Sequence, residues 1–231
     1  MPGWTCASCS SAGVAASSDA MKQAKPRARS LAILSPRVFA WTKALIFVLC
    51  LGPLARLVIG APLDLLGVNP VETIRRSTGT WTLAFVLATL SVTPLRRFTG
   101  WHWLARLRRM LGLYAFFYAV LHFTSYVWLE QFFDGAAIVK DIVKRPFITI
   151  GFAAFAMMVP LAVTSTDAMA KRMGAKNWIA LHRLVYVLAI CGVIHYWWLV
   201  KRDITQPAIY ALVLALLLGY RAASAFRRRA A

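Results

Sequence analysis

Apolar residues along this chain gather into six long segments, separated by shorter polar or basic stretches. Several segments approach the length of about 20 residues that a helix needs to cross the hydrocarbon core of a membrane. Because backbone groups in lipid must be satisfied within the segment, spanning segments of this length form helices. The pattern predicts membrane-spanning helices over residues 43–60, 80–95, 110–132, 147–164, 178–199 and 207–224, of which the second is short and begins in the interface.

The basic residues between the segments predict the orientation of the helices. With the N-terminus in the cytoplasm, 19 Lys and Arg residues lie on the cytoplasmic side and eight on the other. Cytoplasmic loops of membrane proteins carry such an excess. Tryptophans near predicted segment ends, such as Trp41 and Trp101, fit the same layout. The expected fold is an all-α, six-helix transmembrane bundle with both termini in the cytoplasm.

Composition supports the membrane interpretation. The 231 residues are 60% hydrophobic, and 27 Lys and Arg face only eight Asp and Glu, for a net charge of +19. A soluble domain of this length buries one core and does not need successive long apolar runs. The basic residues stand between the runs rather than along one surface element, which argues against nucleic-acid binding.

The two ends of the chain differ from its middle. Residues rich in Ala, Ser, Lys and Arg precede the first apolar segment and predict disorder, and we hypothesise that Met21 is the native start. Cys6 and Cys9 form a CxxC pair, but no second pair accompanies them, so we expect no redox or zinc role there. The predicted divisions are a disordered basic extension over 1–35, a transmembrane domain over 36–226 and a basic cytoplasmic tail over 227–231.

Three of the four histidines lie inside predicted spans. His102 falls in a loop and is expected at the headgroup level, whereas His122, His182 and His195 lie within apolar segments. Ionisable residues inside a membrane are costly and are usually functional. A hydrogen bond between helices is the structural alternative for any one of them.

Depth along the helices pairs two of these histidines. His122 lies thirteen residues beyond Arg109, the last charge before its span, so it falls in the outer half of the membrane, as does His195. Two imidazoles at one depth on two helices can hold a haem iron from both sides. We therefore expect His122 and His195 to be the ligand pair.

His182 has no such partner in the sequence. It lies near the cytoplasmic end, at the level of Arg108 and Arg109, and these two arginines, together with Arg183, are candidate partners for haem propionates. Thirteen residues separate His182 from His195, which leaves the two side chains about 140° apart around an ideal helix. Either the helix is distorted between them, near Gly192, or the two imidazoles point at different neighbours.

Several stretches together resemble one family. They are NPVETIRRSTGTWTL (69–83), TPLRR (93–97), RRMLGLYAFFYAVLHFTSY (108–126), KRPFITIGF (144–152), TSTDAM (164–169) and LHRLVYVLAICGVIHYWWLVK (181–201). In these motifs the chain is similar to the MsrQ family, also called YedZ, of haem-binding membrane subunits. That family belongs to the ferric-reductase-like transmembrane group, together with the NADPH oxidases. The resemblance covers about residues 35–224.

The resemblance implies a role in electron transfer. Members of this family carry electrons from the quinone pool across the bacterial inner membrane to MsrP, a periplasmic molybdopterin enzyme that reduces methionine sulfoxide in oxidised proteins. The family is also associated with FMN. The resemblance therefore implies b-type haem, FMN, an MsrP-type partner in a heterodimer, and no catalytic residue in this chain.

The family's haem histidines map onto His122, His182 and His195. Relatives among the NADPH oxidases carry two histidines on each of two helices, whereas the third segment here offers only His122. The expected number of haems is therefore one or two.

Two other interpretations compete with the haem protein. A small transporter would use the intramembrane histidines as proton or metal sites. A structural membrane subunit would use them only for hydrogen bonds between helices. Bound haem would favour the haem protein over both of these alternatives.

Overall fold

The structure is a computed structural model that describes residues 35–200 and 203–230. The predictions for Cys6, Cys9, Met21 and the basic extension lie outside these residues. The described residues form helices joined by turns and loops, and they contain no strand. The helices are α2 (Pro36–Gly60), α3 (Pro70–Thr99), α4 (Leu104–Ser125), the π-helix η1 (Tyr126–Glu130), α5 (Gly135–Lys144), α6 (Pro146–Val163), α7 (Asp167–Met173), α8 (Ala175–His182), α9 (Leu184–Leu199) and α10 (Thr205–Ala230).

Six helical stretches in the described part of the chain are long and apolar enough to cross a membrane. They are Pro36–Gly60, Pro70–Thr99, Leu104–Glu130, Pro146–Val163, Ala175–Leu199 and Thr205–Arg228. The prediction of an all-α bundle with six spans is confirmed, and the chain is a multi-pass membrane protein. The placement of both termini in the cytoplasm stays a prediction.

The second span is longer than its apolar stretch suggested. Helix α3 has 30 residues and begins where the Asn69 side chain accepts a hydrogen bond from the N–H of Glu72, with Pro70 in the first turn. Asn and Pro favour these positions because they satisfy or remove N–H groups that lack helical partners. Pro94 lies inside the helix, which ends at Thr99 and is followed by Gly100 with φ +73°. Glycine adopts this left-handed conformation without steric strain.

Helix α2 is joined to the bundle by tyrosine hydroxyls. The N–H of Leu54 donates to the Tyr118 hydroxyl (3.1 Å), which donates to the carbonyl of Cys50 (2.8 Å). The Tyr118 hydroxyl thus bridges the N–H of Leu54 and the carbonyl of Cys50, two groups that pair directly in a regular α-helix. This site lies next to Pro53. Tyr114 donates to the carbonyl of Phe47 (2.9 Å). Both tyrosines are buried.

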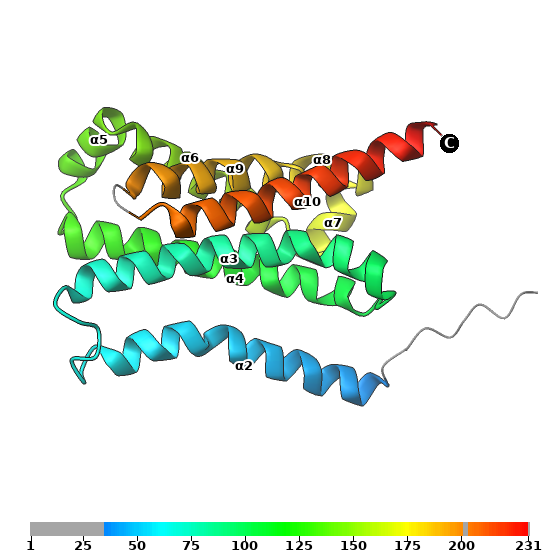
Figure 1. Cartoon of the computed structure of the whole chain (residues 1–231), viewed down its shortest axis with the longest axis horizontal. Coiled ribbons are helices and arrows are strands. Elements are labelled where there is room, and N and C mark those ends of the chain that lie inside the picture. The colour runs from blue at the N-terminus through cyan, green and yellow to red at the C-terminus, as the bar shows by residue number, and fades with distance from the viewer. Residues whose placement is uncertain (1–34, 201–202, 231) are drawn as a thin grey trace, which may run out of the picture. The chain divides into compact units, whose positions relative to one another are not determined.

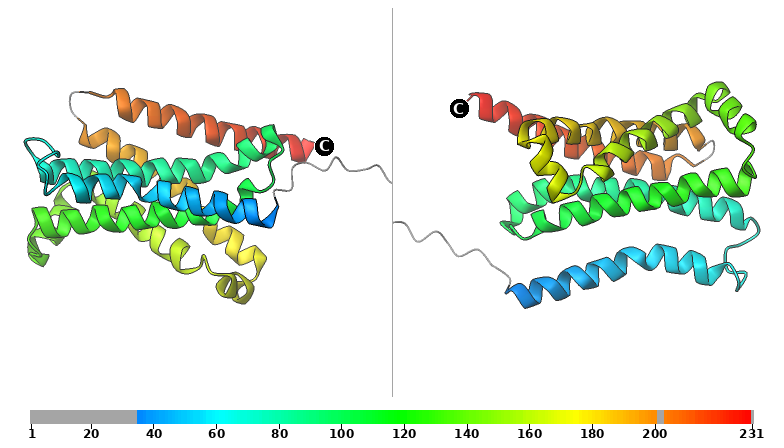
Figure 2. Two further views of the ribbon diagram at one scale, coloured as in Figure 1. Left: turned by 90° about the horizontal axis from the view of Figure 1, so that it is seen from below. Right: turned by 180° about the vertical axis from the view of Figure 1, so that it is seen from behind.

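The core lies between α3, α4, α6 and α9. Figure 1 shows α3 and α4 side by side, with α2 along one side of the pair and α6, α9 and α10 along the other; the right view of Figure 2 shows the same order from behind. Leu90, Tyr118 and Ala189 are fully buried. Large apolar side chains such as Leu212 and Leu216 are exposed, as expected for surfaces that face lipid.

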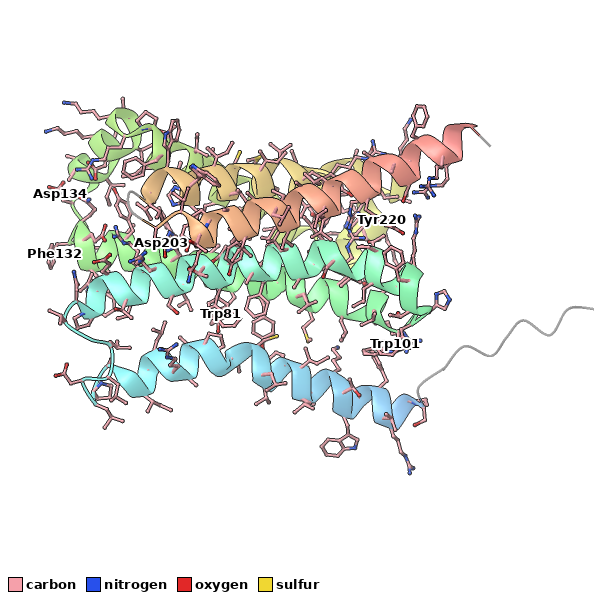
Figure 3. All side chains as sticks on the ribbon, viewed as in Figure 1. Trp81, Trp101, Phe132, Asp134, Asp203 and Tyr220 are labelled. Atoms are coloured by element: carbon pink, nitrogen blue, oxygen red, sulfur yellow. The ribbon has the colours of Figure 1, made fainter. Side chains whose placement is uncertain are left out.

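The ends of the bundle differ in what they carry. Figure 3 shows Phe132, Asp134 and Asp203 at one end, and Trp101 and Tyr220 at the opposite end. We call the first the outer end and the second the inner end, after the predicted orientation. At the outer end, hydrogen bonds from the side chain and the backbone N–H of Thr205 lower the pKa of the Asp203 carboxyl.

Candidate functional site

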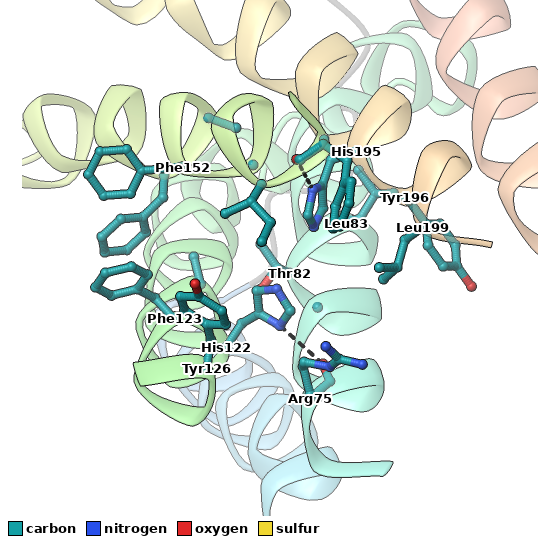
Figure 4. A pocket seen from close by; sticks show the side chains of 18 of the residues that line it. Arg75, Thr82, Leu83, His122, Phe123, Tyr126, Phe152, His195, Tyr196 and Leu199 are labelled. Carbon is teal, nitrogen blue, oxygen red and sulfur yellow. Dashed lines mark hydrogen bonds between the residues drawn. The ribbon is translucent and has the colours of Figure 1, made fainter. Parts of the chain in front are cut away.

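A cavity of about 630 Å³ lies between α3, α4, α6 and α9, near the outer end. Apolar side chains from four helices form most of its wall, while two histidines and several arginines supply its polar groups. Figure 4 shows the imidazoles of His122 and His195 directed into this cavity from different helices. Its lining includes Gly79, Leu83, Val86, His122, Phe123, Gly151, Phe155, Met158, Leu188 and His195.

His122 is oriented by helix α3. Its Nδ1 lies 3.0 Å from the backbone carbonyl oxygen of Arg75. Because a carbonyl can only accept, Nδ1 carries the hydrogen and Nε2 keeps its lone pair. The ring packs so closely on α3 that a Cβ at Gly79 would lie 3.0 Å from the Nδ1 and Cε1 atoms of His122. Gly79 therefore makes room for the ring.

His195 is held in the same way by helix α6. Its Nδ1 donates to the backbone carbonyl of Phe147 at 2.6 Å, which again leaves Nε2 as an acceptor. A Cβ at Gly151 would lie 2.7 Å from that Nδ1. Each histidine thus donates a hydrogen bond to a backbone carbonyl of a neighbouring helix and packs against a glycine one turn further along that helix.

The two rings face one another at a distance suited to a shared metal ion. Their centroids are 6.3 Å apart, and their planes are inclined by 76°. Two imidazoles that bind one ion from opposite sides, each through a nitrogen about 2 Å from it, place their ring centres about 6 Å apart. Hydrogen bonds from Nδ1–H to carbonyls are the usual means by which proteins orient such ligands.

The donor set fits haem better than a bare ion. The described residues include no group of three or more His, Cys, Asp and Glu side chains that could hold a metal ion. A porphyrin would supply the other ligands of its iron, which His122 and His195 would hold. Aromatic and aliphatic walls such as Phe155 and Leu188 suit its apolar faces.

Charged side chains surround the outer part of the cavity. Arg75 pairs with Glu130 at 2.7 Å, and Arg145 pairs with Asp141 at 3.3 Å. The Nε of Arg75 is buried without a hydrogen-bond partner. No functional role was predicted for Arg75 from the sequence. The packing of α3 on α4 places Arg75 beside His122. The only signal in the sequence that could have indicated this is that the two residues lie at the same depth in the membrane.

His182 lies apart from this cavity. Its Nδ1 donates to the carbonyl of Trp178 at 3.0 Å, its ring stacks on the Trp178 indole with centroids 3.8 Å apart, and its Nε2 is buried without a partner. Both alternatives for His182 and His195 are seen: the helix is interrupted between them, at Arg183 rather than near Gly192, and the two imidazoles bond to different neighbours, Trp178 and Phe147.

Of the three arginines expected near His182, Arg108 lies close enough to interact with it electrostatically. Arg109 pairs with Asp167 at 2.7 Å, Arg108 is exposed, and Arg183 lines a separate cavity with residues of α3 and α10. Their role as partners of haem propionates stays a prediction. His102, expected at the headgroup level, is exposed.

Comparison with known proteins agrees with the membrane fold. Residues 44–193 match the family described as "Ferric reductase like transmembrane component". The chain is 52% identical over 197 residues to the "Protein-methionine-sulfoxide reductase heme-binding subunit MsrQ" of Herminiimonas arsenicoxydans, covering 84% of this chain and 90% of that protein. The protein of the same name from Rhodospirillum rubrum is 53% identical over 188 residues, with 80% and 88% covered. That from Bordetella pertussis is 48% identical over 200 residues, with 86% and 97% covered.

Proposed function

Since the chain belongs to the ferric-reductase-like transmembrane family, and within it to the MsrQ heme-binding subunits of protein-methionine-sulfoxide reductase, we propose that it carries electrons through b-type haem held by His122 and His195. The observation that supports this proposal most is that the imidazoles of His122 and His195 face each other in one cavity, with their ring centroids 6.3 Å apart. Haem bound there supplies one-electron redox chemistry.

The protein's own part is to orient the ligands and to exclude water. The carbonyls of Arg75 and Phe147 fix the tautomer of each imidazole and increase its basicity toward a metal. The apolar wall lowers the local polarity, which influences the redox potential of a bound group. Arg75 adds a positive charge beside His122, and Glu130 partly compensates it.

We further propose the direction of transfer. Electrons enter from the quinone pool, directly or through FMN, and leave at the outer end to a periplasmic molybdopterin reductase of the MsrP type, with which the chain forms a heterodimer in the bacterial inner membrane. The location of the cavity near the outer end supports exit on that side. Reduction of methionine sulfoxide is assigned to the partner. We assign no residue to the quinone or to FMN.

His182 is proposed to have one of two roles. It is a ligand of a second haem at the inner end, where its unpartnered Nε2 is the available atom, or it stands beside a single haem. Arg108, Arg109 and Arg183 remain candidate propionate partners in the first case.

An absorption spectrum of the purified protein with a pyridine haemochrome assay tests the proposal. We expect a b-type Soret band that is lost or strongly reduced in His122→Ala and in His195→Ala, because each removes one of the two residues proposed to hold the haem. His102→Ala, at an exposed position, is the matched control and should keep its haem. Normal haem content in both ligand variants would falsify the assignment, and a colourless protein that moves substrate into vesicles would favour a transporter.

A further inference from the structure

A second cavity, of about 450 Å³, lies at the inner end between α3, α9 and α10. Its lining combines four arginines with hydroxyl groups and contains no carboxylate. None of these arginines forms an ion pair with another described residue. The arginines are Arg97, Arg183, Arg221 and Arg228, and the hydroxyl groups belong to Thr93, Tyr186, Tyr220 and Ser224.

Arg221 is held rigidly in this cavity by neutral groups. Its Nη1 donates to the Tyr186 hydroxyl (2.8 Å), and its Nη2 donates to the carbonyl of Leu90 (2.8 Å) and to the Thr93 hydroxyl (3.2 Å). Its guanidinium lies 5.3 Å from the centre of the Tyr186 ring. The Nε atom is buried and has no hydrogen-bond partner. A positive charge that is partly removed from water, with only neutral acceptors, attracts an anion.

We propose that this cavity binds the phosphate of an anionic glycerophospholipid. Guanidinium groups suit phosphate because their N–H donors match its oxygens in pairs. Basic cavities between the ends of spanning helices are known sites for anionic lipid headgroups. A zwitterionic headgroup has no net charge and would leave the positive charge of the four arginines uncompensated. The cavity therefore favours an anionic headgroup.

Apolar groups beside the arginines favour a lipid over free phosphate. Leu218, Ala222 and Ala225 of α10 line the cavity. The rings of Phe98 and Tyr220 pack with their centroids 5.3 Å apart. They lie at the inner end, and aromatic rings at the ends of spanning helices favour the headgroup region. A phosphate held by the arginines would therefore leave acyl chains along α10.

This site is independent of the proposed electron transfer. His182 is not part of its lining, and no metal ligand contributes to it. Arg183, a candidate partner of haem propionates if a second haem is bound, also lines this cavity. Failure of the lipid proposal would leave the haem proposal unchanged, and the reverse also holds.

The test is thermal unfolding of the full-length protein in a neutral detergent, followed by far-UV circular dichroism. Phosphatidylglycerol and phosphatidylcholine with identical acyl chains are titrated at constant ionic strength. We expect phosphatidylglycerol to raise the unfolding temperature saturably and phosphatidylcholine to have little effect. Replacing Arg97 and Arg228 together by Gln should raise the phosphatidylglycerol concentration needed by at least about tenfold. Both are exposed, so their loss leaves the packing of Arg221 intact.

Arg172→Gln is the matched control, because Arg172 is an exposed arginine of α7 at the same end but outside the cavity. Its response to phosphatidylglycerol should equal that of the wild type. Equal stabilisation by both lipids, or an unchanged response of the double variant, would overturn the proposal. Inorganic phosphate is titrated in a third arm; stabilisation as strong as that by phosphatidylglycerol would make this a site for free phosphate and would also overturn it.

Discussion

The Nδ1 atoms of His122 and His195 bond to carbonyls 47 and 48 residues away, on neighbouring helices, whereas His182 bonds to Trp178, four residues back. The outer pair therefore depends on how α3, α4, α6 and α9 pack, while the orientation of His182 is produced within one turn of α8. Glycines make room for both outer rings, and an indole ring stacks on the inner one. This contrast indicates that small changes in helix packing should affect the outer site more than the inner histidine.

The largest effect is expected from the glycine that faces His195. In Gly151→Ala the new Cβ would lie 2.7 Å from Nδ1 of His195, so the ring must move and lose its hydrogen bond to Phe147. Loss of such an orienting interaction weakens metal binding by about 10- to 100-fold. The haem-to-protein ratio after purification measures this. Gly219→Ala, with nothing within 4 Å of the new Cβ, is the control, and equal haem in both variants would contradict the comparison.

The inner histidine should matter less for total haem. We expect His182→Ala to keep at least half of the haem and a Soret band from the outer site, because neither His122 nor His195 contacts residue 182 in the described hydrogen bonds. Quantitative haemochrome assays distinguish one haem per chain from two. A loss of all haem, as expected for His122→Ala, would show that the two regions act as one site.

A charge beside the outer pair should tune its potential. Arg75→Gln removes a cation next to His122 and leaves Glu130 unpaired, so the oxidised form gains stability and the midpoint potential falls by roughly tens of millivolts. Redox titration of the Soret band measures the shift. Arg76→Gln is the matched control, since Arg76 is more exposed (57% against 27%) and pairs with Glu72 on its own helix. A larger shift in the control would refute this role of Arg75.

The smallest effect is expected at the residue that supports His182. Trp178→Phe removes the hydrogen bond from the indole Nε1 to the carbonyl of Thr164 (2.9 Å) but keeps an aromatic ring beside His182. We expect a loss of about 1 kcal/mol in unfolding free energy and no change at the outer site. Thermal unfolding and the absorption spectrum test both points. A shift of the outer Soret band would mean that the inner turn is coupled to the outer cavity.

Much of the fold was predictable from local patterns. The apolar segments indicated the spans because lipid leaves helices as the only solution for such stretches. Depth counted from Arg109 placed His122 at the level of His195. The extension of α3 past Pro94 was not predictable, since a proline inside a spanning helix is tolerated where neighbouring groups compensate.

The sequence by itself determined which segments span, where the intramembrane histidines lie along them, and the family to which the chain belongs. Only the tertiary structure decided that His122 and His195 face each other, that Arg75 and Phe147 orient them, and that Arg183 turns toward α10 at the break after His182. The physical reason is that depth follows from a rise of about 1.5 Å per residue, whereas facing depends on the rotation of each helix, which packing against its neighbours sets.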